Sequence, residues 1–188
     1  LHHMSLTIMG IGYQDAVYLY SLINIKMNPI IIIPNYNDNK YLLSLVKKIR
    51  SYTNTQILII DDGSTKPVKQ IDSIIHLSNN INKGKGYSLI KSFKHAYNLG
   101  YTHAITLDAD FQHPPSYIID FLNIHKDIDI VLGCRNFNSN MPFMRRISNR
   151  MTTAIISSIS RSKLLKDSQC GYRRYKLNTV LSSEYDEL

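Results

Sequence analysis

The sequence predicts an α/β domain with a mostly parallel central sheet and helices on both faces. Short apolar segments rich in β-branched residues alternate along the chain with longer amphipathic segments. Strands that are apolar at every position are typical of a parallel sheet that helices cover on both sides. Polar residues gather where the apolar segments end, and ligands bind beyond the carboxyl ends of strands in such sheets.

Short apolar segments are the expected strands. Residues Ile30 to Ile33 are four consecutive isoleucines between Pro29 and Pro34. Their β-branched side chains and the short length of the run favour a strand buried on both faces. The other expected strands are Gln56 to Ile60, Ile74 to Leu77, His103 to Leu107 and Ile128 to Gly133.

The segments between them have the spacing or the boundary residues of helices. In residues 41–52, apolar side chains recur at helical spacing, and lysines and an arginine occupy other positions. The segment Tyr87 to Leu99 stops at Gly100, a common residue just after a helix. The segment Pro115 to His125 has proline in its first turn. The last expected helix is Phe143 to Ser160.

Composition indicates one globular domain with an anionic partner. The chain has 188 residues, of which 44% are hydrophobic and 19% charged, so it can bury a core and is not of the disordered class. The net charge of +8 suits a nucleotide, a phospholipid headgroup, a lipid phosphate or a nucleic acid, and charge alone does not choose among them. Two cysteines are too few for a disulfide-stapled secreted scaffold.

We expect residues 1–26 to be a tag remnant and an N-terminal extension. His2 and His3 resemble the end of a purification tag, and the apolar segment after them lacks the basic start and cleavage site of a signal peptide. Residues 27–188 are then the catalytic domain, which we expect to be truncated at its C-terminus. No segment approaches the roughly 20 apolar residues of a membrane-spanning helix.

The pair Asp108 and Asp110 follows the expected strand that ends at Leu107. Two carboxylates at this spacing can face one Mg²⁺ or Mn²⁺, which prefer oxygen ligands and usually keep waters and substrate phosphates as well. Such an ion would stabilise the negative charge on a departing diphosphate. Taken alone, the pair would be read as two solvated loop acids, but the preceding strand and the segment Gln112 to Pro115 favour the metal site.

Three further segments have residues suited to nucleotides or phosphates. Asp61 to Ser64 could bind a base or ribose, or could be a turn closed by its own side chains. Asn82 to Gly86 opens a helix with glycines and lysines, which favours an anion, or could be only a polar loop before a helix; it lacks the spacing of a Walker A loop. Arg135, Arg145 and Arg146 could grip phosphate oxygens, or could belong to a solvated basic face.

Together these segments resemble family 2 glycosyltransferases. Ile31 to Asp38 is similar to the opening strand of that family, usually written VVIPAYNE, and Ile59 to Thr65 is similar to its second strand end. Asp108 to Pro115, taken with Asp167 to Arg173, resembles the polyprenyl- or dolichyl-phosphate sugar synthase branch. The resemblance covers Pro29 to Lys176, and the remaining similar segments are Asn82 to Gly86 and Gly133 to Arg135.

The resemblance implies a GT-A fold, the nucleotide-diphospho-sugar transferase fold. It implies an inverting, metal-dependent glycosyltransferase of the EC 2.4 class that uses Mg²⁺ or Mn²⁺. The donor would be a GDP- or UDP-sugar, and the acceptor a polyprenyl or dolichyl phosphate or another lipid or glycan. By position, the nucleotide residues would be Pro34, Tyr36, Asp38, Asp62, Lys85 and Asp108; the metal residues Asp108, Asp110 and Gln112; and the acceptor-phosphate residues Arg135, Arg145 and Arg146.

The candidate catalytic residues are Asp110, Arg135 and Asp167. A lipid phosphate is already an anionic nucleophile and needs no general base, whereas a sugar hydroxyl needs one. Asp167 is the candidate base for a hydroxyl acceptor. The alternative is a structural carboxylate that pairs with Arg173 or caps a turn.

Two features depart from the family pattern, and two other functions stay open. Asp38 stands where the family usually has glutamate, and Thr65 and Lys66 stand where many relatives have an acidic residue. A sugar-1-phosphate nucleotidyltransferase would have a glycine-rich basic loop after the first strand, where Pro34 to Asn37 lie. The charge and 13 tyrosines also suit a basic nucleic-acid-binding module.

For the glycosyltransferase we expect no nucleic-acid partner. Because a lipid-phosphate acceptor lies at a bilayer surface, we expect a cytoplasmic protein that is peripheral at the cytoplasmic membrane face. The sequence leaves an oligomer open.

Overall fold

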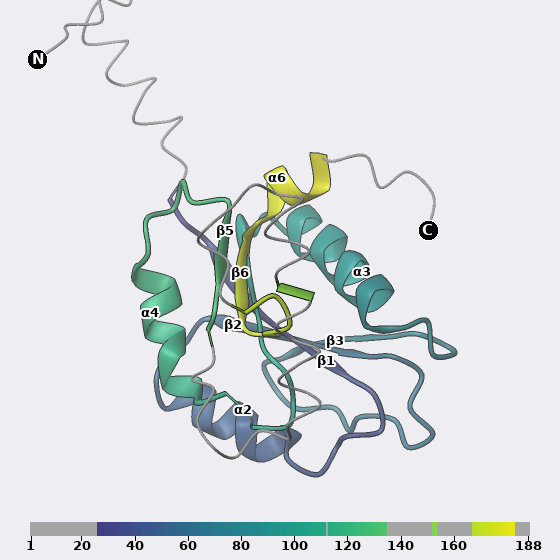
Figure 1. The fold of residues 1–188 in the computed structure, drawn as a ribbon. Helices are drawn as coiled ribbons and strands as arrows, with labels where there is room; N and C mark the ends of the chain where they lie inside the picture. The colour runs from purple at the N-terminus through teal and green to yellow at the C-terminus, as the bar shows by residue number, and fades with distance from the viewer. Residues whose placement is uncertain (1–25, 112, 135–151, 154–166, 183–188) are drawn as a thin grey trace, which may run out of the picture.

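The computed structural model describes residues 26–111, 113–134, 152–153 and 167–182 (Figure 1). These residues form a six-stranded sheet in the order β3-β2-β1-β4-β6-β5. Strands β3, β2, β1 and β4 are parallel, and β6 is antiparallel to both of its neighbours, which confirms the predicted mostly parallel sheet. The strands are β1 Pro29–Asn35, β2 Gln56–Asp61, β3 Ile75–Ser78, β4 His103–Thr106, β5 Ile130–Leu132 and β6 Arg173–Lys176.

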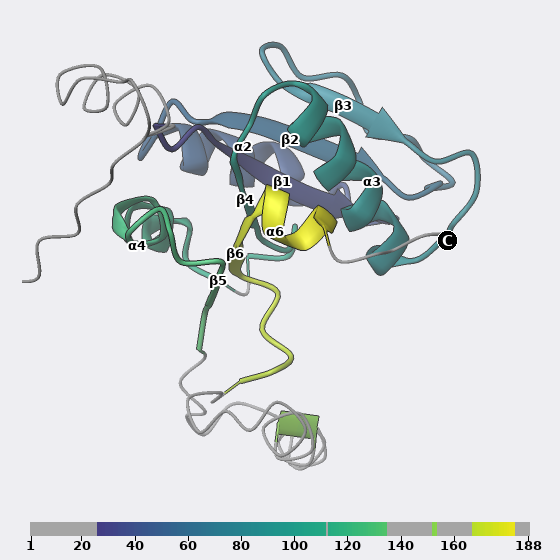
Figure 2. The ribbon, with the colours of Figure 1, turned by 90° about the horizontal axis from the view of Figure 1, so that it is seen from above.

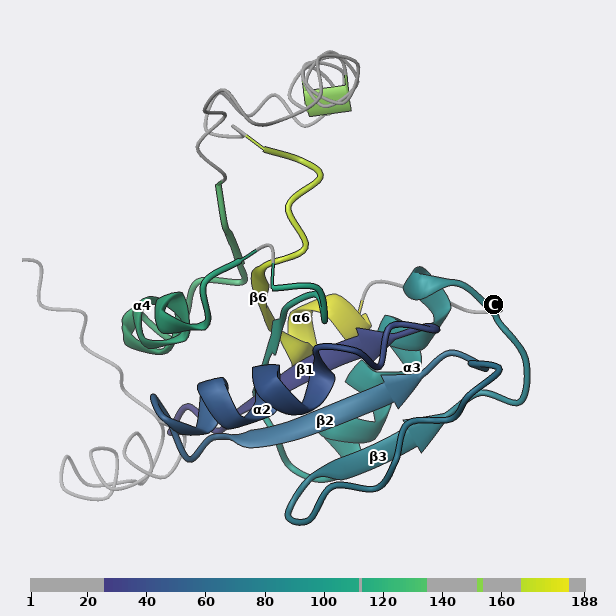
Figure 3. The same ribbon diagram turned by 90° about the horizontal axis from the view of Figure 1, so that it is seen from below.

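Helices cover both faces of this sheet, as predicted. The opposite views in Figure 2 and Figure 3 place α2 and α3 on opposite sides of β1 and β2. Apolar residues of α2 and α4 pack into one core cluster, and those of α3 and α6 pack into the other. Within the described ranges no helix is long and apolar enough to span a bilayer. The helices are α2 Leu42–Arg50, α3 Lys85–Asn98, the 3-10 turn η1 Pro115–Tyr117, α4 Ile118–Asn123 and α6 Leu177–Ser182.

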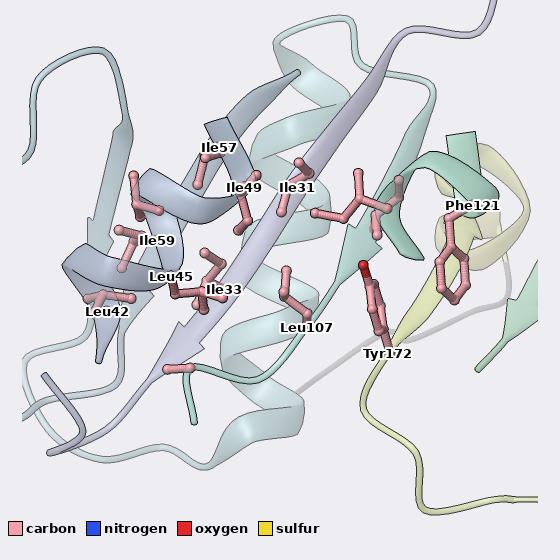
Figure 4. Close-up of a cluster of buried hydrophobic side chains, with 14 of the residues drawn as sticks. Ile31, Ile33, Leu42, Leu45, Ile49, Ile57, Ile59, Leu107, Phe121 and Tyr172 are labelled. Carbon is pink, nitrogen blue, oxygen red and sulfur yellow. The ribbon is translucent and has the colours of Figure 1, made fainter. Parts of the chain in front are cut away.

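The four isoleucines of β1 show why this strand is apolar at every position. Ile31 and Ile33 point into the cluster under α2, while Ile30 and Ile32 point into the cluster under α3. All four are completely buried. Figure 4 shows the first cluster, in which Ile31 and Ile33 lie among side chains from both α2 and the segment before β6. A strand buried on both faces cannot alternate polar and apolar residues, so its sequence is a continuous apolar run.

Several expected boundaries differ from the observed ones. The predicted helix Pro115 to His125 is a 3-10 turn followed by the short α4, because Ile124 adopts an extended conformation. Strand β6 and helix α6 were not predicted as such. Of the expected helix Phe143 to Ser160 only residues 152–153 are described, and these are helical. Residues 1–25 lie outside the described ranges, so a domain start at residue 27 stays a prediction.

Arg174 of β6 is the largest fully buried side chain among the residues that the structure describes. Its guanidinium group donates hydrogen bonds to the carbonyl oxygens of Phe121, Ile124 and His125, at 2.9, 2.6 and 2.7 Å. The last carbonyls of a helix have no partner within the helix, and Arg174 supplies one at the end of α4. Burial lowers the pKa of Arg174 below its ordinary value. The side chain therefore fixes α4 to the sheet through a buried polar contact.

His103 is predicted to make the stability of the fold sensitive to mild acid. Its ring is buried at the start of β4, with Nε2 2.8 Å from the Lys126 carbonyl oxygen. Burial lowers the pKa of His103, so the unfolded chain takes up a proton first as the pH falls below about 6.5. The free energy of unfolding should then decrease as the pH is lowered, by at most about 1.4 kcal/mol per pH unit.

Urea unfolding at several values between pH 5 and pH 8 measures this slope. The variant His103→Gln should flatten it, because the titrating ring is gone. The matched variant His95→Gln, at a half-buried position of α3, is the control for the loss of a histidine elsewhere. An unchanged slope in His103→Gln would show that another group is responsible.

Candidate functional site

The strand directions bring distant segments to one edge of the sheet. The parallel strands β1, β2 and β4 all end there, and the antiparallel β6 begins there. Arg173, the first residue of β6, pairs with Thr106 at the end of β4 and with Leu132 at the end of β5. The segment before β6, residues 167–172, therefore arrives beside the end of β4, which precedes Asp108.

A pocket of about 230 Å³ lies at this edge. Five of the six residues expected to bind the nucleotide line it, and they come from the ends of β1, β2 and β4 and from the start of α3. The sixth, Asp38, is half-buried and is not among the lining residues that the structure describes. The lining residues are Pro34, Asn35, Tyr36, Asp62, Asn82, Gly84, Lys85, Ser88 and Asp108.

Asp62 is buried at the wall of the pocket and holds the turn before α3. Its Oδ1 accepts hydrogen bonds from Asn79 Nδ2 at 2.7 Å and from the backbone N–H of Lys83 at 3.0 Å. Its Oδ2 accepts one from the backbone N–H of Gly84 at 2.8 Å. Burial alone would raise the pKa of Asp62, but these hydrogen bonds and one from Ser88 outweigh it and lower the pKa. The carboxylate thus fixes the shape of this turn.

Asn79 is a site residue that the sequence analysis missed. It is buried directly after β3, and its Nδ2 donates to both Asp62 and Ser88 Oγ. Its Oδ1 accepts a hydrogen bond from Lys91 Nζ at 2.8 Å, and Lys91 also donates to the Ser78 carbonyl at 2.6 Å. This chain of hydrogen bonds, whose donors Asn79 and Lys91 do not line the pocket, orients the Asp62 carboxylate. The available signal was a polar residue two positions after the expected strand Ile74 to Leu77.

Asp61 has a structural role, as in the alternative that Asp61 to Ser64 is a turn closed by its own side chains. Its carboxylate accepts hydrogen bonds from Ser64 N at 3.1 Å, Ser64 Oγ at 2.5 Å and Val68 N at 3.0 Å, and so closes the turn. Thr65 donates hydrogen bonds through N and Oγ1 to Asn37 Oδ1, both at 2.9 Å. These contacts join the loop after β2 to the loop after β1.

Asp108 points away from the core and toward α3. Leu107 and Ala109 on either side of it pack into the cluster under α2. The Asp108 side chain faces the opposite way, where Oδ1 accepts a hydrogen bond from Lys85 Nζ. The side chains of Lys85 and Asp108 are 51% and 32% exposed, so the carboxylate already attracts a cation and stays open to solutes.

These residues fit a divalent cation of the Mg²⁺ or Mn²⁺ type. Such ions are usually bound in proteins through one or two carboxylates together with substrate phosphates and waters. Asp108 lies at the pocket, and Asp110 is half-buried just beyond Ala109. Among the described residues no cluster of three or more His, Cys, Asp or Glu side chains is placed to hold a metal. Gln112, the third expected ligand, lies outside the described residues.

Phe111 follows this acidic pair in a strained conformation. Its φ of 58° lies in the left-handed region, which is uncommon for residues other than glycine. Its ring meets the ring of Tyr41 edge to face, with centroids 6.3 Å apart. Strained backbone of this kind clusters at ligand sites, where the surroundings hold it in place.

The acceptor side of the expected site is only partly described. Asp167 is buried, and its Oδ1 accepts a hydrogen bond from Gln169 N at 3.1 Å, as in a capped turn. Arg173 donates to the carbonyl oxygens of Cys170 at 2.6 Å and Ser168 at 2.7 Å. The expected phosphate-binding residues Arg135, Arg145 and Arg146 lie outside the described residues.

Comparison with known proteins identifies the family and the fold of the chain. The protein family described as "Glycosyl transferase family 2" matches residues 30–178. The UDP-N-acetylglucosamine--dolichyl-phosphate N-acetylglucosaminyltransferase of Methanococcus voltae is 29% identical over 176 residues, covering 80% of this chain and 70% of that protein. The undecaprenyl-phosphate mannosyltransferase of Micrococcus luteus is 26% identical over 176 residues, covering 86% of this chain and 72% of that protein.

A solved structure shares the fold. Glucosyl-3-phosphoglycerate synthase from Mycobacterium tuberculosis, in complex with Mn²⁺, UDP-glucose and phosphoglyceric acid, superposes with a TM-score of 0.64 at 13% identity. The match covers 93% of this chain and 64% of that one, so the chain spans less than two thirds of its solved neighbour. The predicted GT-A fold is thereby confirmed. The chain belongs to glycosyl transferase family 2.

Proposed function

We propose that the chain is the catalytic domain of an inverting glycosyltransferase that moves a sugar from a nucleoside diphosphate sugar to a polyprenyl or dolichyl phosphate. The observation that carries this proposal is the meeting of Tyr36, Asp62, Lys85 and Asp108 at one pocket on the carboxyl edge of the sheet. The names of the similar proteins, which include dolichyl-phosphate and undecaprenyl-phosphate transferases, support the acceptor class. A glycan acceptor is the second candidate.

The donor nucleotide is proposed to lie between the end of β1 and the start of α3. Tyr36 is 48% exposed beside Pro34 and offers a flat surface to a base. Gly84 precedes the first turn of α3, where backbone N–H groups favour an anion. Lys85 brings an ammonium group to the same place, so the diphosphate would lie against this turn. Asp62 acts by holding the turn in shape, and Asp38 stays a predicted base or ribose contact.

Asp108, Asp110 and Gln112 are the residues proposed to hold Mg²⁺ or Mn²⁺. When bound, such an ion supplies positive charge that stabilises the departing nucleoside diphosphate. The chain's own contribution is to present the Asp108 carboxylate at the pocket and to place the Lys85 ammonium group beside it. When the diphosphate arrives, Lys85 can exchange its contact with Asp108 for a phosphate oxygen.

The acceptor is proposed to enter beside residues 167–173. An oxygen of the lipid phosphate attacks the anomeric carbon in line with the departing diphosphate, and the configuration at that carbon inverts. A phosphate nucleophile needs no general base, and Arg135, Arg145 and Arg146 are proposed to orient it. Asp167 would act as a base only toward a hydroxyl acceptor. A lipid acceptor would place the enzyme at the cytoplasmic face of the membrane.

A melting-temperature panel with UDP, GDP and their sugars, each with and without Mn²⁺, tests the donor site. A ligand at a hundred times its Kd stabilises the native state by about 2.7 kcal/mol, which raises the melting temperature by several degrees. We expect one of the two nucleotides to do this only in the presence of Mn²⁺. Melting-temperature shifts that do not depend on Mn²⁺, or that any oligonucleotide produces and added salt abolishes, would instead favour a nucleic-acid-binding module.

A transfer assay tests the acceptor class. The nucleotide sugar identified by the panel is mixed with a short polyprenyl phosphate or with the matched polyprenol, which lacks the phosphate. We expect a glycosyl phosphate product from the first and none from the second. Equal glycosylation of the alcohol would contradict the phosphate acceptor and would make Asp167 the candidate base.

A further inference from the structure

Gly171 lies directly against the Asp108 carboxylate. A Cβ atom at residue 171 would clash with Asp108 Oδ2 and would meet Cγ at 2.8 Å and Oδ1 at 2.9 Å. These three nearest atoms all belong to the Asp108 side chain, and none leaves room for a methyl group. The need for glycine here comes from space, because the backbone of Gly171 does not adopt a left-handed conformation.

The backbone around Gly171 is held in place by contacts on both sides. Thr106 Oγ1 donates a hydrogen bond to the Gly171 carbonyl at 2.9 Å, and Gly133 N donates to the Tyr172 carbonyl at 2.8 Å. The Tyr172 ring is buried and stacks on Phe121, with centroids 4.6 Å apart. If a side chain were added at 171, the short Asp108 side chain would therefore move more easily than this backbone.

The Asp108 carboxylate is thus bounded by two distant parts of the chain. Gly171 lies on one side, and Lys85 Nζ contacts Oδ1 from α3. Arg173 holds the segment that contains Gly171 through the carbonyls of Ser168 and Cys170. The direction in which Asp108 points is set from outside its own loop.

We propose that Gly171 is a positioning residue of the donor site, which acts by fixing the Asp108 carboxylate where it can hold a divalent cation. The effect on cation binding rests on the proposed function, whereas the contact between Gly171 and Asp108 does not depend on it. The contact is also a physical link between the segment expected to face the acceptor and the carboxylate expected to face the donor. A movement of the segment 167–173 would therefore shift the Asp108 carboxylate through Gly171.

Calorimetric titration of UDP and GDP into the Gly171→Ala variant, with Mn²⁺ and with a chelator, tests this role. Displacing a group that orients a metal ligand typically lowers metal affinity about 10- to 100-fold. We expect at least a roughly tenfold loss of nucleotide affinity with Mn²⁺ and less than about a twofold loss without it. A general distortion of the site would lower both affinities alike, and that outcome would overturn the proposal.

Gly133→Ala is the matched control. A Cβ there would meet the Tyr172 carbonyl oxygen at 2.8 Å and Cys170 Sγ at 3.1 Å, so it disturbs the same segment without touching Asp108. We expect its nucleotide affinity to depend on Mn²⁺ as in the wild type. A selective loss of the Mn²⁺-dependent affinity in both variants would show that any disturbance of this segment suffices, and would overturn the specific role of Gly171.

A melting-temperature cycle tests the contact without any ligand. Asp108→Ala removes all three atoms that a Cβ at 171 would meet. We expect Gly171→Ala to lower the melting temperature when Asp108 is present, and to leave it unchanged or raise it in the Asp108→Ala background, where alanine only restricts the unfolded chain. Equal shifts in both backgrounds would overturn the contact. If the wild type binds no nucleotide, the proposed function fails, and this cycle still decides the contact.

Discussion

Asp108→Asn is expected to lower kcat/KM for sugar transfer by at least about a hundredfold while the fold stays intact. Asparagine keeps the shape of the side chain but removes the negative charge that attracts both Lys85 and a divalent cation. Loss of one group that stabilises charge in the transition state typically costs a factor of about 10² to 10³. The half-exposed ion pair with Lys85 contributes only about 0–1 kcal/mol to stability, so the melting temperature should change little.

The matched control for this variant is Asp127→Asn. Asp127 is an exposed carboxylate that lies within 4.0 Å of Lys176 Nζ, at the end of β6 opposite to the pocket. The Asp127→Asn substitution removes the same charge from the protein as Asp108→Asn. Its kcat/KM should stay within about twofold of the wild type, because a distant surface charge is screened by salt. Full activity in Asp108→Asn would contradict its role, and equal losses in both variants would point to a general effect of net charge.

Arg174→Ala is expected to lower the free energy of unfolding by about 3–5 kcal/mol, the largest effect on stability that we predict. The substitution leaves a cavity and removes the donor from the carbonyls of Phe121, Ile124 and His125. Buried acceptors without a partner keep the full cost of losing water. Since domains of this kind are stable by about 5–15 kcal/mol, a large share of the stability would be lost.

Urea unfolding monitored by circular dichroism measures this loss. Arg174→Met separates its two causes, because methionine fills much of the space but donates no hydrogen bond, and its loss should be intermediate. Arg50→Ala is the control, since Arg50 also donates to backbone carbonyls, those of Thr55 and Ser73, but from a partly exposed position. A loss in Arg174→Ala no greater than in Arg50→Ala would contradict the structural role of the buried guanidinium group.

The sequence predicts strands well where hydropathy alone decides their burial. In β1 the neighbours on both faces are apolar, so four isoleucines predict the strand without knowledge of the fold. In β6 the sequence Arg173-Arg174-Tyr175-Lys176 is polar, and it is a strand because tertiary contacts compensate its burial. Arg174 has its carbonyl partners, and Tyr175 packs on Phe93 with ring centroids 5.0 Å apart. Compensation of this kind cannot be seen in a hydropathy pattern.

In the candidate site, too, some features could be predicted from the sequence and others depend on tertiary contacts. The gathering of Asp62, Lys85 and Asp108 was predictable, because residues after parallel strands meet at one edge of a sheet. The contacts that give the supporting residues their roles were not predictable. Asn79 matters because it donates to Asp62, and Gly171 matters because Asp108 lies where its Cβ would be. Both requirements arise from contacts between segments far apart in the sequence.

Crystals soaked with Mn²⁺ and the nucleotide identified by the melting panel provide the most direct test of the metal site. Anomalous scattering at the manganese edge locates the ion without reference to activity. We expect one manganese peak in contact with the Asp108 carboxylate and the nucleotide diphosphate, with Lys85 Nζ moved from Asp108 to a phosphate oxygen. A manganese peak away from Asp108, or a nucleotide bound outside the pocket between Tyr36 and Lys85, would contradict the proposed site.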